Sequence, residues 1–154
     1  MERSITGFHR DDLHDWVAEL DCYHGQHVRH KPPFFNRPWT ETEVGRQSML
    51  GTMLDCVRCD HLEFPAGLTE YKRTPVFTET TVAAGLLHEH STKAGVWGMI
   101  LVEEGMLEYT VHYPEDRIQQ LHGGDTAVVV PQMKHRVRPL DVVRFCVAFY
   151  RRES

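Results

Sequence analysis

Short runs of alternating apolar and polar residues fill the chain after about residue 70. Alternation places successive side chains on opposite faces of a strand, so each run predicts a half-buried strand. Turn residues separate the runs, and no amphipathic helical stretch lies between them. The pattern predicts an antiparallel β-sandwich or barrel. The expected strands are residues 76–78, 85–90, 97–103, 106–112, 118–121, 126–130, 135–138 and 142–150.

The first 68 residues predict a small module of short strands with one helix. Either Thr40 or Thr42 is suited to cap the helix. A Pro-Ala-Gly segment at residues 65–67 marks the expected boundary between two domains, residues 1–68 and residues 69–154. The expected elements of the module are strands at 5–9, 15–21 and 27–30 and a helix at 41–50.

The composition is that of an ordinary globular chain, with 41% hydrophobic and 25% charged residues among 154. No apolar run approaches the roughly 18 residues of a membrane span, and the N-terminus lacks the apolar stretch of a signal peptide. We therefore expect a cytoplasmic protein without a membrane partner. In that compartment cysteines near histidines hold metal more often than they form disulfides. Cys146 lies in an apolar stretch and is expected to be a buried core residue.

The net charge of −5 argues against nucleic acid as a partner. Residues 1–68 carry 7 basic and 11 acidic side chains, and residues 69–154 carry 10 and 11. Neither part has the basic surplus of a general nucleic-acid binder. The run from His27 to Lys31 is a local basic patch of only five residues.

Two close pairs of metal-binding side chains, Cys22-x-His24 and Cys56-x-x-Cys59, stand about 30 residues apart. Thiolate and imidazole are the ligands that tetrahedral zinc prefers. A module of about 65 residues buries little apolar surface, and a structural metal is one standard remedy. Four protein ligands would close the coordination sphere, so we expect a structural zinc.

The fourth zinc ligand has three candidates, because His27 and His30 also lie near Cys22. His24 fits best, since it lies two residues from Cys22 and directly before Gly25, which is free to take a positive φ. A redox-active Cys-x-x-Cys and unpaired surface thiols are the alternatives to a zinc site. A thioredoxin-like site would need a βαβ unit, which the pattern lacks.

Three histidines in the β-rich part form a second candidate site. His88 and His90 share a face if residues 85–90 form a strand, and a jelly roll would bring His135 beside them. A facial set of three histidines with open positions suits a second divalent metal such as iron, nickel or zinc. The alternative is a set of hydrogen-bonded pocket histidines without metal.

The histidines also follow the outline of the cupin metal motifs, with His-x-His, a glycine turn, and a later Pro and His. The glutamate of that pattern is missing, because the position seven residues before Gly105 is Gly98. Further motifs are Tyr71-Lys-Arg-Thr-Pro-x-Phe-Thr, His90-Ser-Thr-Lys-Ala-Gly-Val-Trp-Gly98, Pro131-Gln-Met-Lys-His135-Arg-Val and Arg144-Phe-x-Val-x-Phe-Tyr150. On these motifs, residues 71–150 closely resemble the TehB/YeaR-like cupin family, which includes the N-terminal domain of TehB-type tellurite-resistance proteins.

This resemblance implies a double-stranded β-helix (cupin/jelly roll) in a stress-associated bacterial protein. His90, Lys93, Trp97 and His135 match its motif positions, whereas His88 falls where the pattern is looser. Methyl transfer to tellurite in TehB proteins belongs to a separate methyltransferase domain. This chain has no Gly-rich strand-to-helix loop for S-adenosylmethionine, so that activity is not expected here.

Lys93 beside two histidines would make a pocket attractive to small oxyanions or carboxylates, with Trp97 as an apolar wall. The simpler interpretations are a solvated loop charge for Lys93 and a core position for Trp97.

The N-terminal part contains the motifs Asp15-Trp-Val-Ala-Glu-Leu20, Cys22-x-His24, Asn36-Arg-Pro-Trp39 and Leu54-Asp-Cys56-x-x-Cys59. On these motifs, residues 3–68 resemble a small bacterial Cys/His-containing family of unknown function. The resemblance implies that this module, expected to be zinc-ribbon-like, is fused to the cupin barrel. It brings no activity with it.

The favoured hypothesis is a stress-associated, tellurite-resistance-like cupin that binds a small ligand, oxyanion or metal in its barrel. A metal-dependent cupin enzyme of the dioxygenase or isomerase type is the first alternative. A regulatory interaction module is the second, with the zinc knuckles and the exposed-looking Phe34-Phe35 as its contact surface. We also expect a homodimer, paired through Val142–Tyr150 as an edge strand.

Overall fold

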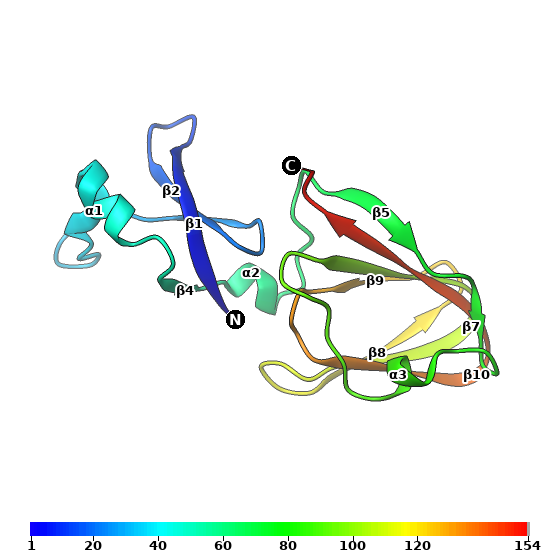
Figure 1. The fold of residues 1–154 in the computed structure, drawn as a ribbon. Coiled ribbons are helices and arrows are strands. Elements are labelled where there is room, and N and C mark those ends of the chain that lie inside the picture. Colours follow the sequence, from blue (N-terminus) through cyan, green and yellow to red (C-terminus); the bar gives the residue numbers. More distant parts are fainter. Residues whose placement is uncertain (154) are drawn as a thin grey trace. The chain divides into compact units, whose positions relative to one another are not determined.

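The computed structural model describes residues 1–153, and the chain folds into two compact units, Met1–Arg58 and Cys59–Ser154. Both units are built mainly from antiparallel strands, as the sequence predicts (Figure 1). The division falls inside a short helix, a few residues before the Pro-Ala-Gly segment. No helix within residues 1–153 has the length and apolar character needed to span a membrane.

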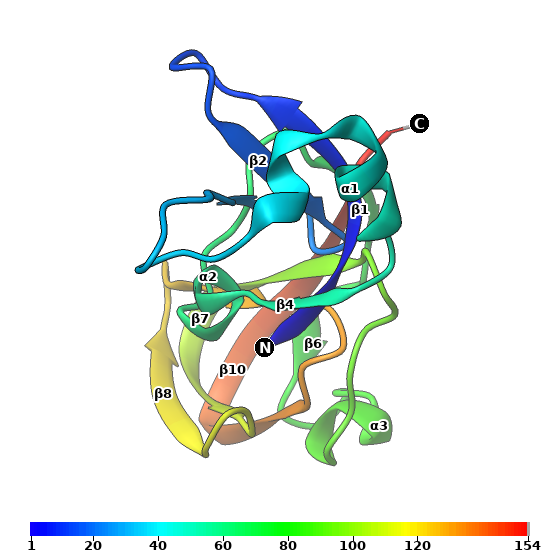
Figure 2. The same ribbon diagram turned by 90° about the vertical axis from the view of Figure 1, so that its left-hand side faces the viewer.

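The first unit contains a four-stranded sheet in the order β3-β2-β1-β4. Its strands are β1 (Glu2–Arg10), β2 (Trp16–Leu20), β3 (Gly25–His27) and β4 (Met53–Asp55). β1 and β2 form a hairpin whose connecting turn projects from the unit (Figures 1 and 2, blue). The unit buries a small apolar core of Ile5, Val17, Ala18, Leu20 and Val28, drawn from β1, β2 and the residue after β3.

Three short helices accompany this sheet: η1 (Pro38–Glu41), α1 (Glu43–Ser48) and α2 (Val57–Asp60). Thr42 caps α1, because its hydroxyl accepts a hydrogen bond from the Gly45 amide at 3.0 Å. The predicted helix is therefore confirmed with tighter bounds. α2 was not predicted, since four residues are too few to show a helical period.

The predicted third strand lies two residues early, at Gly25–His27. Gly25 does not take a positive φ; Tyr23 does, at 72°. Gly25 is instead needed for close approach, since a Cβ there would meet Val17 Cγ1 at 2.8 Å.

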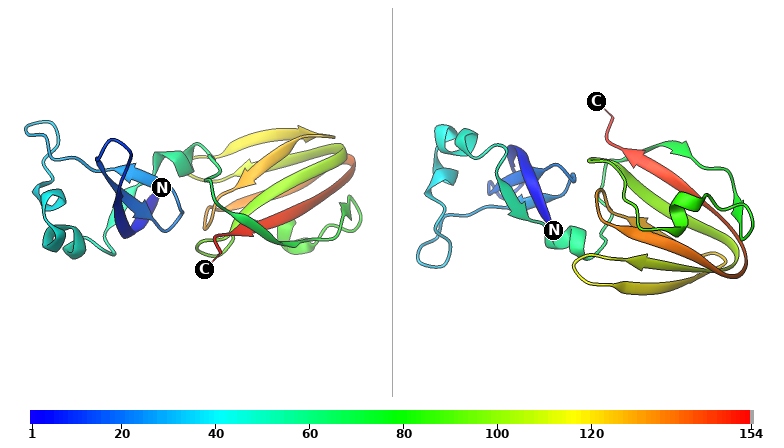
Figure 3. Two further views of the ribbon diagram at one scale, coloured as in Figure 1. Left: turned by 90° about the horizontal axis from the view of Figure 1, so that it is seen from above. Right: turned by 60° about the horizontal axis from the view of Figure 1, so that its bottom comes forward.

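The second unit contains a six-stranded sheet whose main path runs β5-β10-β7-β8. In addition β6 pairs with β10, and β9 pairs with β7. Figure 3 shows the long strands β7 and β10 running side by side through this unit. The strands are β5 (Thr69–Arg73), β6 (Phe77–Thr78), β7 (Trp97–Val111), β8 (Arg117–His122), β9 (Thr126–Val129) and β10 (His135–Arg151).

Two of the predicted strand breaks are wrong, because β7 and β10 each run on through them. Gly105 carries β7 past the first break with φ +82°, and a Cβ there would overlap the Val142 carbonyl. The pairing register of β10 shifts between Pro139 and Val143, opposite this glycine. A bulge of this kind bends a strand without ending it.

The predicted strand at residues 85–90 is also wrong. Residues Ala84–Leu87 form the short helix α3, none of whose residues is buried. Alanine and leucine favour helix, and no neighbouring strand pairs with this segment to override that preference. Only His90 keeps a β-type contact, an isolated bridge to His135.

The residues that follow the cysteine pair pack on the barrel. Phe64 makes edge-on ring contacts with Trp97 and Tyr150, at centroid distances of 5.8 and 5.1 Å. Arg117 Nη1 donates a hydrogen bond to the Asp60 carbonyl at 2.6 Å. Cys146 is buried, as expected.

The expectation that Val142–Tyr150 is an edge strand is wrong. This segment belongs to β10, which pairs with β7 on one side and with β5 and β6 on the other. Its backbone groups are therefore already engaged, so it offers no free edge to a second copy.

Candidate functional site

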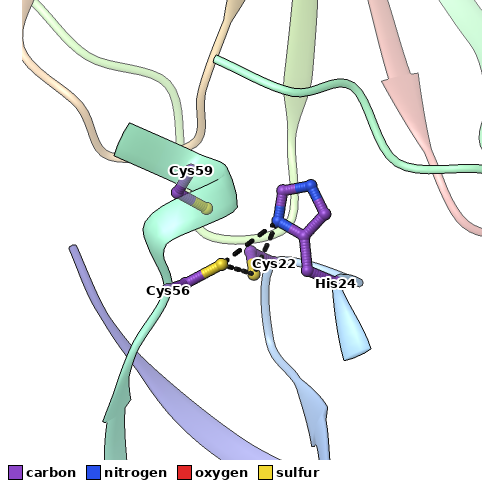
Figure 4. Close-up of side chains that lie close together, drawn as sticks. All are labelled: Cys22, His24, Cys56 and Cys59. Atoms are coloured by element: carbon purple, nitrogen blue, oxygen red, sulfur yellow. Dashed lines mark hydrogen bonds between the residues drawn. The ribbon is translucent and has the colours of Figure 1, made fainter. Parts of the chain in front are cut away.

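The four side chains predicted to bind zinc come together in one buried cluster (Figure 4). The ligand atoms of Cys22, His24, Cys56 and Cys59 all lie within 4.8 Å of one another. None of the four residues is more than 3% exposed. The cluster is a candidate metal site.

The sheet explains why two distant pairs meet. β1 lies between β2 and β4 and is antiparallel to both, so β2 and β4 run in the same direction. Each therefore ends beside the start of β1, where Leu20 pairs with Ile5 and Asp55 with Glu2. The residues that follow these two strands are the two ligand pairs.

Local turns then aim the ligands inward. After β2 the chain reverses tightly, and the Leu20 amide donates to the His24 carbonyl at 3.0 Å. After β4, Cys56 precedes α2 and Cys59 lies on it, one helical turn later. Residues three apart on a helix share a face, so both thiols point toward Cys22 and His24.

The distances fit a tetrahedral zinc. With Zn–S near 2.3 Å and Zn–N near 2.0–2.1 Å, a tetrahedron has S···S edges of about 3.8 Å and S···N edges of about 3.5 Å. The Cys22 and Cys56 sulfurs lie 3.8 Å apart. His24 Nδ1 lies 3.5 Å from the Cys22 sulfur and 3.3 Å from the Cys56 sulfur. A disulfide would instead need about 2.05 Å between sulfurs.

The other candidate histidines are engaged elsewhere. His27 Nε2 lies 2.7 Å from Asp11 Oδ2, and this contact lowers the pKa of the Asp11 carboxyl. His30 Nδ1 accepts a hydrogen bond from the Arg37 amide at 3.0 Å. His24 is therefore the histidine of the cluster, and Nδ1 is the nitrogen that faces the sulfurs.

The barrel unit holds a cavity of about 360 Å³. Its polar lining comes from the β5 strand, the loop before β7 and the first residue of β10, and its apolar wall from the strands behind. The lining residues are Tyr71, Lys72, Leu86, His90, Ser91, Thr92, Lys93, Val96, Ile100, Val129, His135, Val137, Phe145, Val147 and Phe149.

His90 and His135 sit side by side in this cavity. Each amide donates to the other residue's carbonyl at 2.9 Å, and the ring centroids lie 4.1 Å apart. His90 Nδ1 lies 2.9 Å from the His88 carbonyl, and His135 Nδ1 lies 2.8 Å from the Met133 carbonyl. Burial lowers the pKa of His135 to about 4, so this imidazole is neutral at physiological pH.

The remaining predicted cavity residues divide into two groups. Lys93 lines the cavity, as the pocket interpretation requires. Trp97 is not part of the lining; it is fully buried in β7 and packs on Phe64. The core interpretation of Trp97 is therefore the right one.

His88 does not join the other two histidines as a ligand. It ends α3, its side chain is exposed, and it contacts His90 through its carbonyl oxygen. Within residues 1–153, the Cys/His cluster is the one group of three or more His, Cys, Asp or Glu ligands close enough to share an ion. The structure thus places two histidines, His90 and His135, in the barrel site.

The sequence interpretation missed Lys72 as a cavity residue. It lies on β5, a strand that was not predicted because all five of its residues are exposed and show no alternation of burial. Lys72 pairs in register with Phe149, which also lines the cavity. The resemblance motif beginning at Tyr71 was the one signal that could have pointed to it.

Comparisons with known proteins give a separate family match for each part of the chain. Residues 6–63 match a family described as a protein of unknown function (DUF3565), and residues 72–147 match the TehB-like domain. No curated protein matches the sequence.

Several solved structures are similar to this chain. A protein from E. coli (strain K12) is 22% identical and covers 59% of this chain and 88% of its own, with a TM-score of 0.55. TehB from Haemophilus influenzae is 27% identical and covers 56% of this chain with a TM-score of 0.50, but the match spans only 32% of TehB. A cupin-2 domain containing protein from Shewanella frigidimarina is 14% identical, with coverages of 53% and 64% and a TM-score of 0.35.

The motif positions and the two family models agree on the family of each part. Residues 72–147 belong to the TehB-like domain family, and residues 6–63 belong to the family of unknown function DUF3565.

Proposed function

We propose that the barrel binds a small anionic molecule, a carboxylate or an oxyanion, in the cavity that contains His90 and His135. The observation that carries this proposal is the charge of the lining. Its ionisable side chains are two lysines, two histidines and a tyrosine, and none of the lining residues, all in the described part of the chain, is acidic. A cavity of this size suits a small ligand.

The two lysines are available to such a ligand. The side chains of Lys72 and Lys93 make no ion pair or hydrogen bond with any other of residues 1–153. Both are exposed at the cavity rim. An anion that enters would therefore gain attraction from both lysines without displacing a carboxylate partner.

We further propose that the metal of the Cys/His cluster is zinc and that its role is structural. The support is the agreement of the S···S and S···N distances with a tetrahedral zinc, together with four protein ligands. Zinc in small modules contributes on the order of 10 kcal/mol of apparent folding free energy. Thiolate ligands need a reducing compartment, which accords with a cytoplasmic location.

The match to the TehB-like domain supports a role in the bacterial stress response, of the tellurite-resistance kind. Tellurite is itself a small oxyanion and would be a ligand of the proposed class. The homodimer also stays a proposal, with the exposed edge strand β5 now the better candidate surface than β10.

A metal-dependent cupin enzyme is the second candidate. The observation in its favour is the adjacent pair of imidazoles in the cavity. The lack of a third nearby protein ligand among residues 1–153 weighs against it.

The first test is elemental analysis of the purified protein beside two double variants, Cys56→Ser/Cys59→Ser and His90→Ala/His135→Ala. One zinc per chain, lost only in the cysteine variant, supports the structural zinc and a non-enzymatic barrel. A second metal lost only in the histidine variant would favour the cupin enzyme. No metal in the wild type would contradict the zinc proposal.

The anion proposal is tested by calorimetric titration with tellurite, acetate and hexanoate. The variant Lys72→Ala/Lys93→Ala should weaken binding at least tenfold, because both cavity lysines are removed. Lys134→Ala is the matched control, since Lys134 is an exposed lysine outside the cavity lining. No binding of any of these anions to the wild type, or equal loss in both variants, would refute the proposal.

A further inference from the structure

The two cavity histidines are held in one orientation by the backbone. The reciprocal amide-to-carbonyl hydrogen bonds between His90 and His135 fix the two chain segments against each other. Each ring is then tied by Nδ1 to the carbonyl two residues earlier, at 2.9 Å for His90 and 2.8 Å for His135. The two imidazoles are therefore preorganised before any ligand enters.

These contacts also fix the tautomer. A carbonyl oxygen only accepts hydrogen bonds, so the proton of each neutral imidazole must lie on Nδ1. Nε2 of each ring is then an unprotonated acceptor. Two such acceptors cannot bond to each other, and no hydrogen bond within residues 1–153 engages either Nε2, so both are open to a donor on a ligand.

The rest of the lining gives the other properties of such a donor molecule. Lys72 and Lys93 supply positive charge for an anionic group. The aliphatic and aromatic side chains of Ile100, Val147 and Phe149 supply an apolar wall. The cavity thus offers a cationic rim, a hydrocarbon wall and a pair of acceptors.

We propose that the ligand of the barrel is a hydroxylated carboxylic acid, whose carboxylate meets the lysines and whose hydroxyl donates to an Nε2 of the His90–His135 pair. This inference rests on the proposed anion-binding function and names the ligand class. The hydrocarbon between the two polar groups packs on the apolar wall. A hydroxyl left without an acceptor in such a cavity would cost free energy. The His90–His135 pair therefore lets the cavity select a hydroxylated acid.

A divalent metal is the other occupant that two free imidazole nitrogens suit. The lining favours the hydroxyl, because it contains two lysines and none of its residues, all in the described part of the chain, is acidic. Nearby positive charges disfavour a cation in the same cavity. The metal is therefore kept as an outcome of the test.

The experiment uses the full chain with ¹⁵N-labelled histidine at pH 7.5. Long-range ¹H–¹⁵N spectra should show both His90 and His135 as the Nδ1–H tautomer in the free protein. Calorimetric titration then compares hexanoate with 2-, 3- and 6-hydroxyhexanoate. At least one hydroxy acid should bind about tenfold more tightly than hexanoate and shift an Nε2 resonance, the size expected for one added hydrogen bond.

The variant His90→Phe keeps an aromatic ring but removes one Nε2 acceptor, and it should reduce the preference for the hydroxy acid while hexanoate still binds. If hexanoate binds the wild type but no hydroxy acid binds better, the ligand class is wrong and the anion-binding function stands. If neither hexanoate nor any hydroxy acid binds, the ligand class is wrong, and both proposals fail when tellurite and acetate do not bind either. An Nε2–H tautomer at either histidine would overturn the hydroxy-acid proposal. So would a shift of both Nε2 resonances on adding stoichiometric Zn²⁺ or Ni²⁺.

Discussion

Replacing His135 by asparagine should remove most of the acid sensitivity of the barrel. His135 is 4% exposed, and its pKa is lowered from 6.5 to about 4 in the folded protein, chiefly by burial. The unfolded chain therefore binds this proton more readily than the folded one. The stability that neutral His135 provides is present above about pH 6.5 and is lost as the pH falls toward 4.

The magnitude follows from the two pKa values. A difference of about 2.5 units corresponds to about 3 kcal/mol when the pH is below both values. Between pH 7.5 and pH 5.0, His135 alone should lower the free energy of unfolding by about 2 kcal/mol. Asparagine does not titrate, and its side-chain amide can replace Nδ1 as the donor to the Met133 carbonyl.

Urea unfolding is followed at both pH values by the amide signals of β7 and β10, which report on the barrel unit alone. The asparagine variant loses ring packing, but that cost is the same at both pH values and cancels. Ionisable groups that do not interact with residue 135 contribute equally to both proteins and cancel as well. An equal loss of stability between pH 7.5 and 5.0 in wild type and variant would refute the reasoning.

Three further predictions concern the backbone, the barrel core and the metal. Gly105→Ala should lower the free energy of unfolding of the barrel by about 3 kcal/mol or more, because a left-handed φ is combined with a clash on the Val142 carbonyl. Gly124→Ala is the control, since it has a similar φ but open space around it. It should cost only roughly 1–2 kcal/mol in the same urea unfolding. Tyr109→Phe should cost about 1 kcal/mol, since the buried tyrosine hydroxyl donates to the Val128 carbonyl at 2.8 Å; unchanged unfolding would show that this bond adds nothing. A chelator should collapse the amide dispersion of residues 1–58 while the barrel signals persist, and loss of both sets together would contradict a local structural metal.

Much of the metal site could be predicted from the sequence because its signal is local. Cys22 and His24 form one close pair, Cys56 and Cys59 form another within a single helical turn, and the residue types are themselves the chemistry. His24 was favoured over His27 and His30 by its spacing from Cys22, and the structure agrees, since His27 contacts Asp11 and His30 accepts from the Arg37 amide.

The barrel cavity was less accessible to sequence reasoning. Lys93 and the two motif histidines were identified, but Lys72 and the role of His88 were not. Strand β5 is exposed on all five residues, so it has no alternating pattern to detect. The apolar residues of the segment 84–87 fit the spacing of a helix and of a strand equally well. The segment forms a helix because no strand pairs with it.

The sequence by itself determined the two-part organisation, the predominance of strands and the identity of the four candidate metal ligands, because periodicity, turn residues and ligand types are properties of short segments. Tertiary structure alone decided that β7 and β10 continue through their apparent breaks and that Trp97 faces away from the cavity. It also decided that His90 and His135 meet as a pair with fixed tautomers. These features depend on hydrogen bonds and packing between segments far apart in the chain, which no local pattern encodes.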